Sequence, residues 1–169
     1  FFDKPIYKAN LTFAMEEDKG SSGGLSGALG LASSFGIDLG SGGGGAFASS
    51  NISELMKSKL IVEKVLLNPV FINGKKFPLI EYYLQINQYR KKWKGKKELE
   101  NLTFSSYSNR QHFSRLQDSI IGIVYKNLID KDKLDIIQKD KKVTILTIQV
   151  LSNDEIFSKL FCDTVEGIR

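Results

Sequence analysis

Residues 142–165 read KVTILTIQVLSNDEIFSKLFCDTV, and they combine a predicted strand with a predicted helix. The part from Lys142 to Leu151 is rich in Val, Ile and Thr, the residues that strands favour. Ser152-Asn-Asp-Glu155 has the capping-box pattern that opens a helix. The apolar residues of this last helix are Ile156, Phe157, Leu160, Phe161 and Val165. A strand followed directly by an amphipathic helix predicts a helix that packs on a sheet.

Two further strands are predicted to join this one. Leu134–Gln138 precedes it across the charged turn Lys139–Lys142. From Tyr7 to Glu16, apolar and polar residues alternate with the period of a strand that buries one face. We therefore predict one α+β domain over residues 1–169. In it, the N-terminal strand and the late strands form a small mixed sheet, and helices pack on that sheet.

Between the first strand and the late strands, the sequence predicts three helices and a hairpin. The first helix is capped at Asn51, carries apolar residues to Leu66 and ends at Asn68-Pro69. Asn73-Gly74 is the favoured dipeptide of a tight turn and predicts a hairpin over residues 70–77. The remaining predicted elements are a helix that begins at Pro78 and frays near Gly95, and a helix from about Asn109 to Ile129.

A glycine-rich excursion follows the first strand, over residues 18–50. It holds 11 of the 15 glycines of the chain, all of them between Gly20 and Gly45. Glycine in a helix costs about 1 kcal/mol relative to alanine, so we expect only a short, marginal helix there. We predict that Gly20–Gly24 and Gly40–Ser50 are the most mobile internal segments.

The chain is mildly basic, with a formal net charge of +5. Its densest basic cluster consists of Arg90, Lys91, Lys92, Lys94, Lys96 and Lys97. Such a run predicts a solvated helix end more often than an anion-binding patch. Tyr89 and Trp93 fall on the apolar stripe of the predicted helix, so we expect them in the core. We therefore predict no nucleic-acid partner, because that would need basic residues interleaved with free stacking aromatics.

Catalytic and metal-binding patterns are missing from the sequence. His112 is the only histidine, and no Gly-x-Ser-x-Gly frame supplies a nucleophile for it to activate, so we predict an ordinary polar helix residue. No glycine is followed by Lys-Ser or Lys-Thr, the end of a phosphate-binding loop. With Cys162 as the only cysteine, a disulfide within the chain is impossible and a Cys/His zinc site is excluded.

These absences predict no catalytic, cofactor-binding or metal-binding residues and a protein that is not an enzyme. Cys162 lies among apolar residues and is expected to be buried. The acidic clusters at Glu16–Asp18 and Asp130–Asp132 fall at predicted element ends, where solvated carboxylates are common. A general acid and base would need two carboxyls at a set separation in a pocket.

Three segments, in order, resemble the chain length determinant (Wzz-type) family, also called polysaccharide co-polymerases. They are Tyr7–Phe13; Gly24–Ile37 followed by a helix like Leu55–Val62; and Val143–Val150 followed by Asp154–Phe161. The glycine-rich excursion and the Asn73-Gly74 hairpin are most similar to members from Bacteroidetes-type bacteria.

The resemblance implies a bacterial inner-membrane protein with two membrane helices and a large domain in the periplasm. It implies a ring-like homo-oligomer that sets the modal length of lipopolysaccharide O-antigen, capsule or exopolysaccharide. The implied partners are a polysaccharide polymerase, the growing polysaccharide, or both. The chain opens on Phe1-Phe2 rather than Met. We therefore expect it to be part of a parent protein whose flanking segments supply the membrane helices.

Two other functions fit the same residues. The first is the periplasmic domain of a related polysaccharide-export tyrosine autokinase, whose parent would carry a Walker motif after residue 169. The second is a soluble adaptor or adhesin domain in which the glycine-rich segment binds a protein partner. A second hydrophobic run in the parent would favour the chain length determinant.

Overall fold

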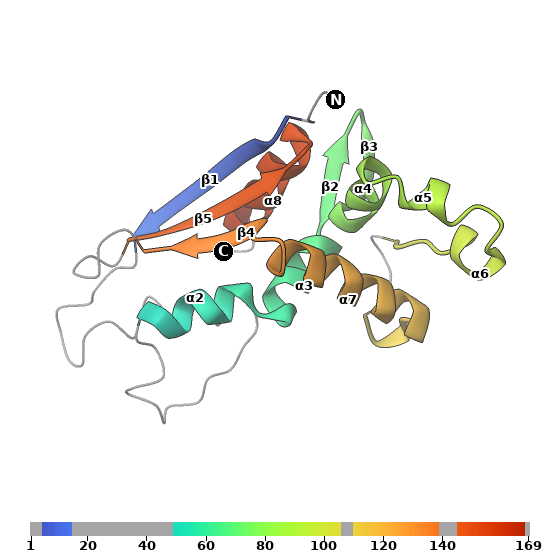
Figure 1. Ribbon diagram of the computed structural model, residues 1–169, viewed down its shortest axis with the longest axis horizontal. Coiled ribbons are helices and arrows are strands. Elements are labelled where there is room, and N and C mark those ends of the chain that lie inside the picture. The colour runs from blue at the N-terminus through green and yellow to red at the C-terminus, as the bar shows by residue number, and fades with distance from the viewer. Residues whose placement is uncertain (1–4, 15–48, 106–109, 139–144, 168–169) are drawn as a thin grey trace.

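The computed structural model describes residues 5–14, 49–105, 110–138 and 145–167 and has an α+β fold, as predicted (Figure 1). Its elements are β1 (Tyr7–Ala14), α2 (Ser49–Lys57), α3 (Lys59–Leu67), β2 (Pro69–Ile72), β3 (Lys75–Pro78), α4 (Leu79–Ile86), α5 (Tyr89–Lys92), α6 (Lys97–Glu100), the 3₁₀ turn η1 (Arg110–His112), α7 (Arg115–Ile129), β4 (Leu134–Ile137), β5 (Ile145–Ser152) and α8 (Glu155–Gly167). No helix in these ranges is long and apolar enough to cross a membrane.

The main sheet has the strand order β1-β5-β4, which confirms that the early strand pairs with the late ones. Ile148 of the central strand lies between Leu11 of β1 and Ile136 of β4. Both pairings are antiparallel, so the prediction of a mixed sheet is wrong. The reason is that β1 and β4 run in the same direction but lie on opposite sides of β5, where they share no hydrogen bonds.

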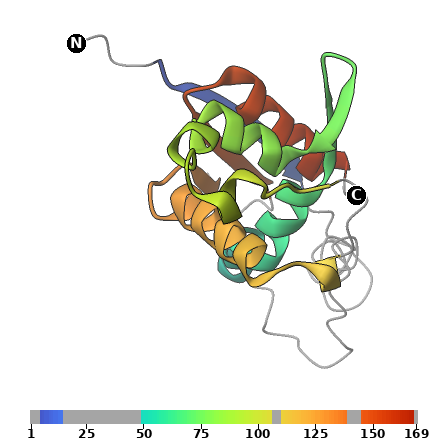
Figure 2. The ribbon, with the colours of Figure 1, turned by 90° about the vertical axis from the view of Figure 1, so that its right-hand side faces the viewer.

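One part of the core lies between a face of this sheet and α8, and the core continues among α3, α4 and α7. Leu146, Ile148 and Val150 alternate along β5 and are almost completely buried. They face the side on which α8 packs against β1 and β5 and buries Phe157 and Phe161 (Figures 1 and 2). Residues 145–167 thus form a strand and a following helix that packs on the sheet, as the sequence predicts.

The predicted helix from Asn51 to Leu66 is two helices, α2 and α3. Ser58 interrupts it with extended backbone (φ −60°, ψ 149°), and its hydroxyl accepts a hydrogen bond from the Ile61 amide. Because α2 begins at Ser49, Asn51 lies inside the helix and is not its cap. The predicted excursion over 18–50 and its mobility lie outside the described residues, except for Ser49 and Ser50 in the first turn of α2.

The predicted helix from Pro78 to Gly95 is also divided. Pro78 is the N-cap residue of α4 and not its first helical residue. The helix ends at Ile86, and Gln88 then adopts a left-handed backbone conformation with φ 57° before the single turn α5. Leu79, Tyr82, Tyr83 and Trp93 are nevertheless buried in the core, while Tyr89 is partly buried against it.

The hairpin β2–β3 is confirmed. Asn73 and Gly74 both have positive φ, 51° and 74°, as a primed turn requires. The hairpin projects from the helices in both views (Figures 1 and 2).

The last two helices begin later than the sequence predicts. The helix predicted from Asn109 is α7, which starts at Arg115 behind a capping box made by Ser114 and Gln117. In α8 the cap is Asp154 rather than Ser152, since the Asp154 carboxylate accepts the hydrogen bond from the Phe157 amide. The Ser152 hydroxyl accepts instead from the Asp154 amide.

Candidate functional site

An open cleft beside α4 has both polar and aromatic residues in its lining. Its volume is about 460 Å³, within the size range of small-molecule sites. It is lined by Phe77, Glu81, Gln85, Arg90, Thr103 and Phe104. Glu81 and Gln85 are one turn apart on α4 and therefore lie on the same face of that helix. The cleft thus combines two aromatic rings with four side chains that are able to form hydrogen bonds.

The Glu81 carboxylate fixes the position of the lining segment at residues 102–104. Its Oε1 accepts a hydrogen bond of 2.6 Å from the Phe104 amide, and its Oε2 lies 2.5 Å from Nη2 of Arg90. Nη1 of Arg90 donates to the carbonyl of Leu102. These charge-assisted bonds hold residues 102–104 against α4 although they are more than 20 positions away from Glu81.

Arg90 therefore differs from the lysines around it. It is half-buried, paired with Glu81, and lies 5.4 Å from the ring centre of Trp93. Lys91, Lys92, Lys94, Lys96 and Lys97 are exposed, as predicted for a solvated helix end. The role of Arg90 was missed because a guanidinium nine residues from a carboxylate matches no helical pairing distance.

The side chains of two residues that line the cleft, Gln85 and Thr103, remain available to hydrogen-bond a ligand. Gln85 and Thr103 are both exposed, and the Gln85 amide and the Thr103 hydroxyl bond to none of the residues that the structure describes. Phe77 is half-buried, and Phe104 is almost completely buried against the ring of Phe113, whose centre is 5.8 Å away. The cleft can therefore form new polar contacts at its exposed side chains while its aromatic wall stays in place.

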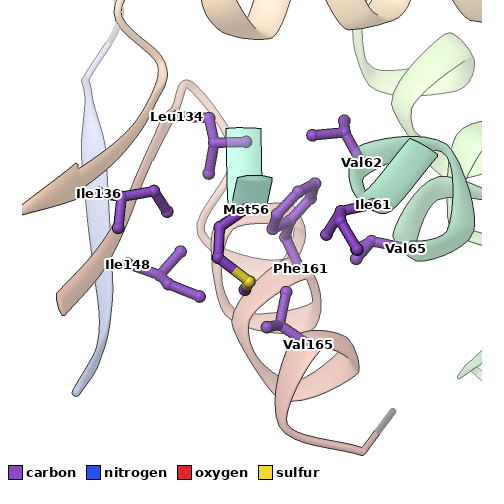
Figure 3. A pocket seen from close by; sticks show the side chains of 9 residues that line it. All are labelled: Met56, Ile61, Val62, Val65, Leu134, Ile136, Ile148, Phe161 and Val165. Carbon is purple, nitrogen blue, oxygen red and sulfur yellow. The ribbon is translucent and has the colours of Figure 1, made fainter. Parts of the chain in front are cut away.

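A second hollow lies inside the core and has no functional chemistry. Its volume is about 10 Å³, near the lower limit for a single water molecule. Figure 3 shows its apolar lining, which consists of Met56, Ile61, Val62, Val65, Leu134, Ile136, Ile148, Phe161 and Val165. A space of this size with no polar partner is a packing gap between α2, α3, the sheet and α8.

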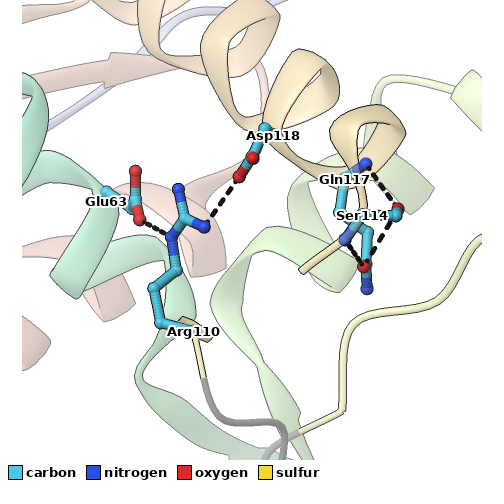
Figure 4. A network of polar contacts seen from close by, with 5 residues as sticks. All are labelled: Glu63, Arg110, Ser114, Gln117 and Asp118. Carbon is cyan, nitrogen blue, oxygen red and sulfur yellow. Dashed lines mark hydrogen bonds and ion pairs between the residues drawn. The ribbon is translucent and has the colours of Figure 1, made fainter. Parts of the chain in front are cut away.

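Arg110 forms a separate polar network between α3 and α7 (Figure 4). Its Nε donates to Glu63, and its Nη1 lies 2.7 Å from Oδ1 of Asp118. The hydrogen bond to Glu63, together with the two negative charges, raises the pKa of Arg110 above its usual value. The network ties the short turn η1 to both helices, so its role is structural. His112 is exposed in the same turn and takes no part in the network.

The other residues considered from the sequence are not brought together. Cys162 is buried as predicted, and burial followed by the charge of Asp163 raises its pKa to about 11, which leaves an unreactive thiol. Asp130 and Asp132 are exposed at the end of α7, and Glu16–Asp18 lie outside the described residues. In the described ranges, no three His, Cys, Asp or Glu side chains gather where they could hold a metal ion.

The aromatic residues near the lysines belong to the core, as predicted. Trp93 is buried, and Tyr89 packs between Tyr83 and Trp93 with ring-centre distances of 6.3 and 5.7 Å. The two ring pairs are tilted by 34° and 59°, and the cations of Arg90 and Lys92 lie over the rings of Trp93 and Tyr89. These rings are thus engaged in contacts within the domain, which does not favour stacking on bases.

The domain is thus an α+β fold with an antiparallel three-stranded sheet and a lateral cleft. Comparison with known proteins adds no relative: no family model, no curated protein and no solved structure matches the chain significantly.

Proposed function

We propose that this chain is the periplasmic domain of an inner-membrane polysaccharide co-polymerase. It regulates the modal chain length of a cell-surface polysaccharide and forms no glycosidic bond itself. The observation that carries the proposal is the pairing of β1 with β5 along the whole of both strands, from Tyr7 opposite Ser152 to Ala14 opposite Ile145. The segments that resemble the family at the two ends of the chain thus form a single structural unit.

The proposal assigns the domain a mechanical role. Because the sequence shows no pattern for a catalytic nucleophile, an acid–base pair or a metal site, we propose that the domain acts by holding a polymerase or a growing chain in one geometry. Self-association into a ring, which the resemblance implies, repeats that geometry around an axis. The lateral cleft offers a place for non-covalent contact with the polymer.

Deletion of the parent gene tests the proposal. Polymer synthesis is expected to continue while the length distribution on a gel ladder of surface polysaccharide loses its modal peak. Phe13→Asp places a charge on the buried face of β1, which costs several kcal/mol, and is expected to unfold the domain and reproduce the deletion. His112→Ala changes an exposed residue and serves as the matched control.

Complete loss of polymer in the deletion strain contradicts the proposal, because it would indicate a role in bond formation. Loss of length control in His112→Ala, with the fold intact, would contradict it as well. The sequence of the parent after residue 169 separates the regulator from the related autokinase, which carries a Walker motif there.

A second candidate function is a protein-binding adaptor, and one observation favours it. Phe71 on the projecting hairpin is 69% exposed, and Lys76 on the neighbouring strand lies 5.5 Å from its ring centre. Exposed aromatic residues are enriched at interfaces. Unchanged polysaccharide length in the deletion strain, together with a partner that Phe71→Ala releases, would favour the adaptor.

A further inference from the structure

We propose that the cleft lined by Glu81, Gln85, Arg90 and Thr103 binds a neutral sugar ring of the polysaccharide. That the ring belongs to the polysaccharide rests on the proposed function. That the ligand is a neutral sugar follows from the charges and side chains of the cleft.

The charges of the cleft favour an uncharged ligand. Glu81 and Arg90 are the ionised residues of its lining, and they neutralise each other at 2.5 Å. An anionic ligand that approached Arg90 would meet the carboxylate of Glu81, and a cationic ligand would meet the guanidinium. A neutral ligand avoids both repulsions and can still hydrogen-bond to either group.

The free polar groups match the hydroxyls of a sugar. A hydroxyl both donates and accepts hydrogen bonds. The Gln85 amide offers a carbonyl oxygen and an NH₂ group, and the Thr103 hydroxyl can serve in either sense. Both line the cleft, one from α4 and one from the segment that Glu81 holds.

The apolar part of the lining completes the recognition. Phe77, which is half-buried, contributes aromatic surface beside these polar groups, whereas Phe104 is almost completely buried. A pyranose ring has C–H faces and a hydroxyl perimeter, so it can place a face on an aromatic surface while its edge reaches polar groups. A wholly apolar ligand would leave Gln85 and Thr103 unpaired, and a small ion would leave the aromatic surface uncovered.

The cleft is also held in shape before a ligand arrives. The amide of Phe104 and the carbonyl of Leu102 are both bonded to the Glu81–Arg90 pair. Binding therefore needs no ordering of this wall, which lowers its entropic cost.

Amide chemical shifts of the purified chain test the proposal by titration with neutral trisaccharides of glucose, galactose, mannose and N-acetylglucosamine. At least one sugar is expected to shift the amides of residues 81–85 and 102–105, with a Kd on the order of 1 mM. Gln85→Ala combined with Thr103→Ala is expected to weaken that binding by at least about fivefold without changing Tm, because it removes two hydrogen-bonding groups. Ser119→Ala, an exposed change on α7, is the control and should bind as the wild type does.

The inference fails if none of these sugars shifts the cleft amides up to about 50 mM, which is far above the expected Kd. It also fails if the double variant binds as the wild type does. The same titration is carried out with tri-galacturonate and with inorganic phosphate. Shifts with these anions alone, centred on Lys91–Lys97, would overturn the assignment in favour of an anion-binding patch.

The titration and the deletion together distinguish this inference from the proposed function. If deletion of the parent gene abolishes length control but the wild-type chain binds none of the sugars, the assignment of the cleft is wrong while the proposed regulator function is supported. If the cleft binds sugar while deletion leaves the length distribution unchanged, the proposed regulation of chain length is wrong and the sugar-binding site is supported.

Discussion

The two ends of the molecule are held together by different forces. At one end, the sheet and α8 bury an uninterrupted apolar layer that includes Leu146, Val150 and Phe157. At the other end lies the distal arm, defined as residues 87–105, which includes α5 and α6 and extends away from the sheet (Figure 1). Neither of its helices buries a residue of its own.

The distal arm depends on few contacts. Trp93, Leu102 and Phe104 are its buried apolar residues, and the Glu81 carboxylate supplies its main polar anchor. Apolar burial is spread over many contacts and is tolerant of small shifts, whereas a charge-assisted pair is directional and depends on one geometry. The comparison indicates that substitutions in the cleft should leave the packing of the sheet and α8 intact, because the cleft lies at the end of the molecule that Glu81 anchors.

The largest expected effect tests the apolar end. Phe157→Ala removes a fully buried ring that packs on Tyr83 and Phe161, with ring-centre distances of 5.2 and 6.1 Å. We expect a loss of about 3–5 kcal/mol in the free energy of unfolding by urea denaturation. Hydrogen exchange should accelerate throughout β1, β5, α8 and the arm together. Acceleration confined to α8 would show that the sheet end is not one cooperative unit.

A smaller and local effect is expected at the polar end. Glu81→Ala leaves the Phe104 amide and the Arg90 guanidinium without their partner, which costs about 1–3 kcal/mol. Exchange should accelerate in residues 89–105 while the amides of β5 keep their protection. Glu98→Ala, an exposed carboxylate on α6, is the matched control and should change neither. Equal acceleration in β5 would remove the distinction between the two ends.

The smallest expected effect lies where the two ends meet. The Tyr82 hydroxyl of α4 donates to the Asp154 carboxylate, 3.1 Å away, which also caps α8. Burial first, and then the charge and hydrogen bond of Asp154, raise the pKa of Tyr82 from its usual 10.0 to about 12. The folded state thus favours the protonated phenol. Its contribution is complete below pH 10.0 and is lost as the pH rises toward 12.

Tyr82→Phe is therefore expected to lose about 1 kcal/mol at neutral pH. The difference in Tm between wild type and variant should shrink as the pH rises from about 10 to about 12. A constant difference across that range would show that the hydroxyl contributes no pH-dependent stability.

Sequence periodicity predicted where the main elements lie and which faces they bury, but it did not predict where helices break. Apolar spacing continues through Ser58 and Gln88, so both positions look helical. At the first break, the Tyr125 hydroxyl from α7 donates to the Lys57 carbonyl, and Ser58 caps the next helix. At the second, the Asn87 amide donates to the Tyr83 carbonyl before Gln88 turns left-handed. Local side-chain bonds and a distant tyrosine therefore override the pattern.

The sequence by itself determined the strand alternation, the primed turn at Asn73-Gly74 and the buried positions of the helices. These follow from the fixed periods of strands and helices and from the φ values that asparagine and glycine tolerate. Only the tertiary structure decided the order β1-β5-β4 and the meeting of Glu81, Arg90 and the Phe104 amide. Such contacts join groups whose separation along the chain has no period, so their partners are selected by the packing of the whole core and leave no local signal.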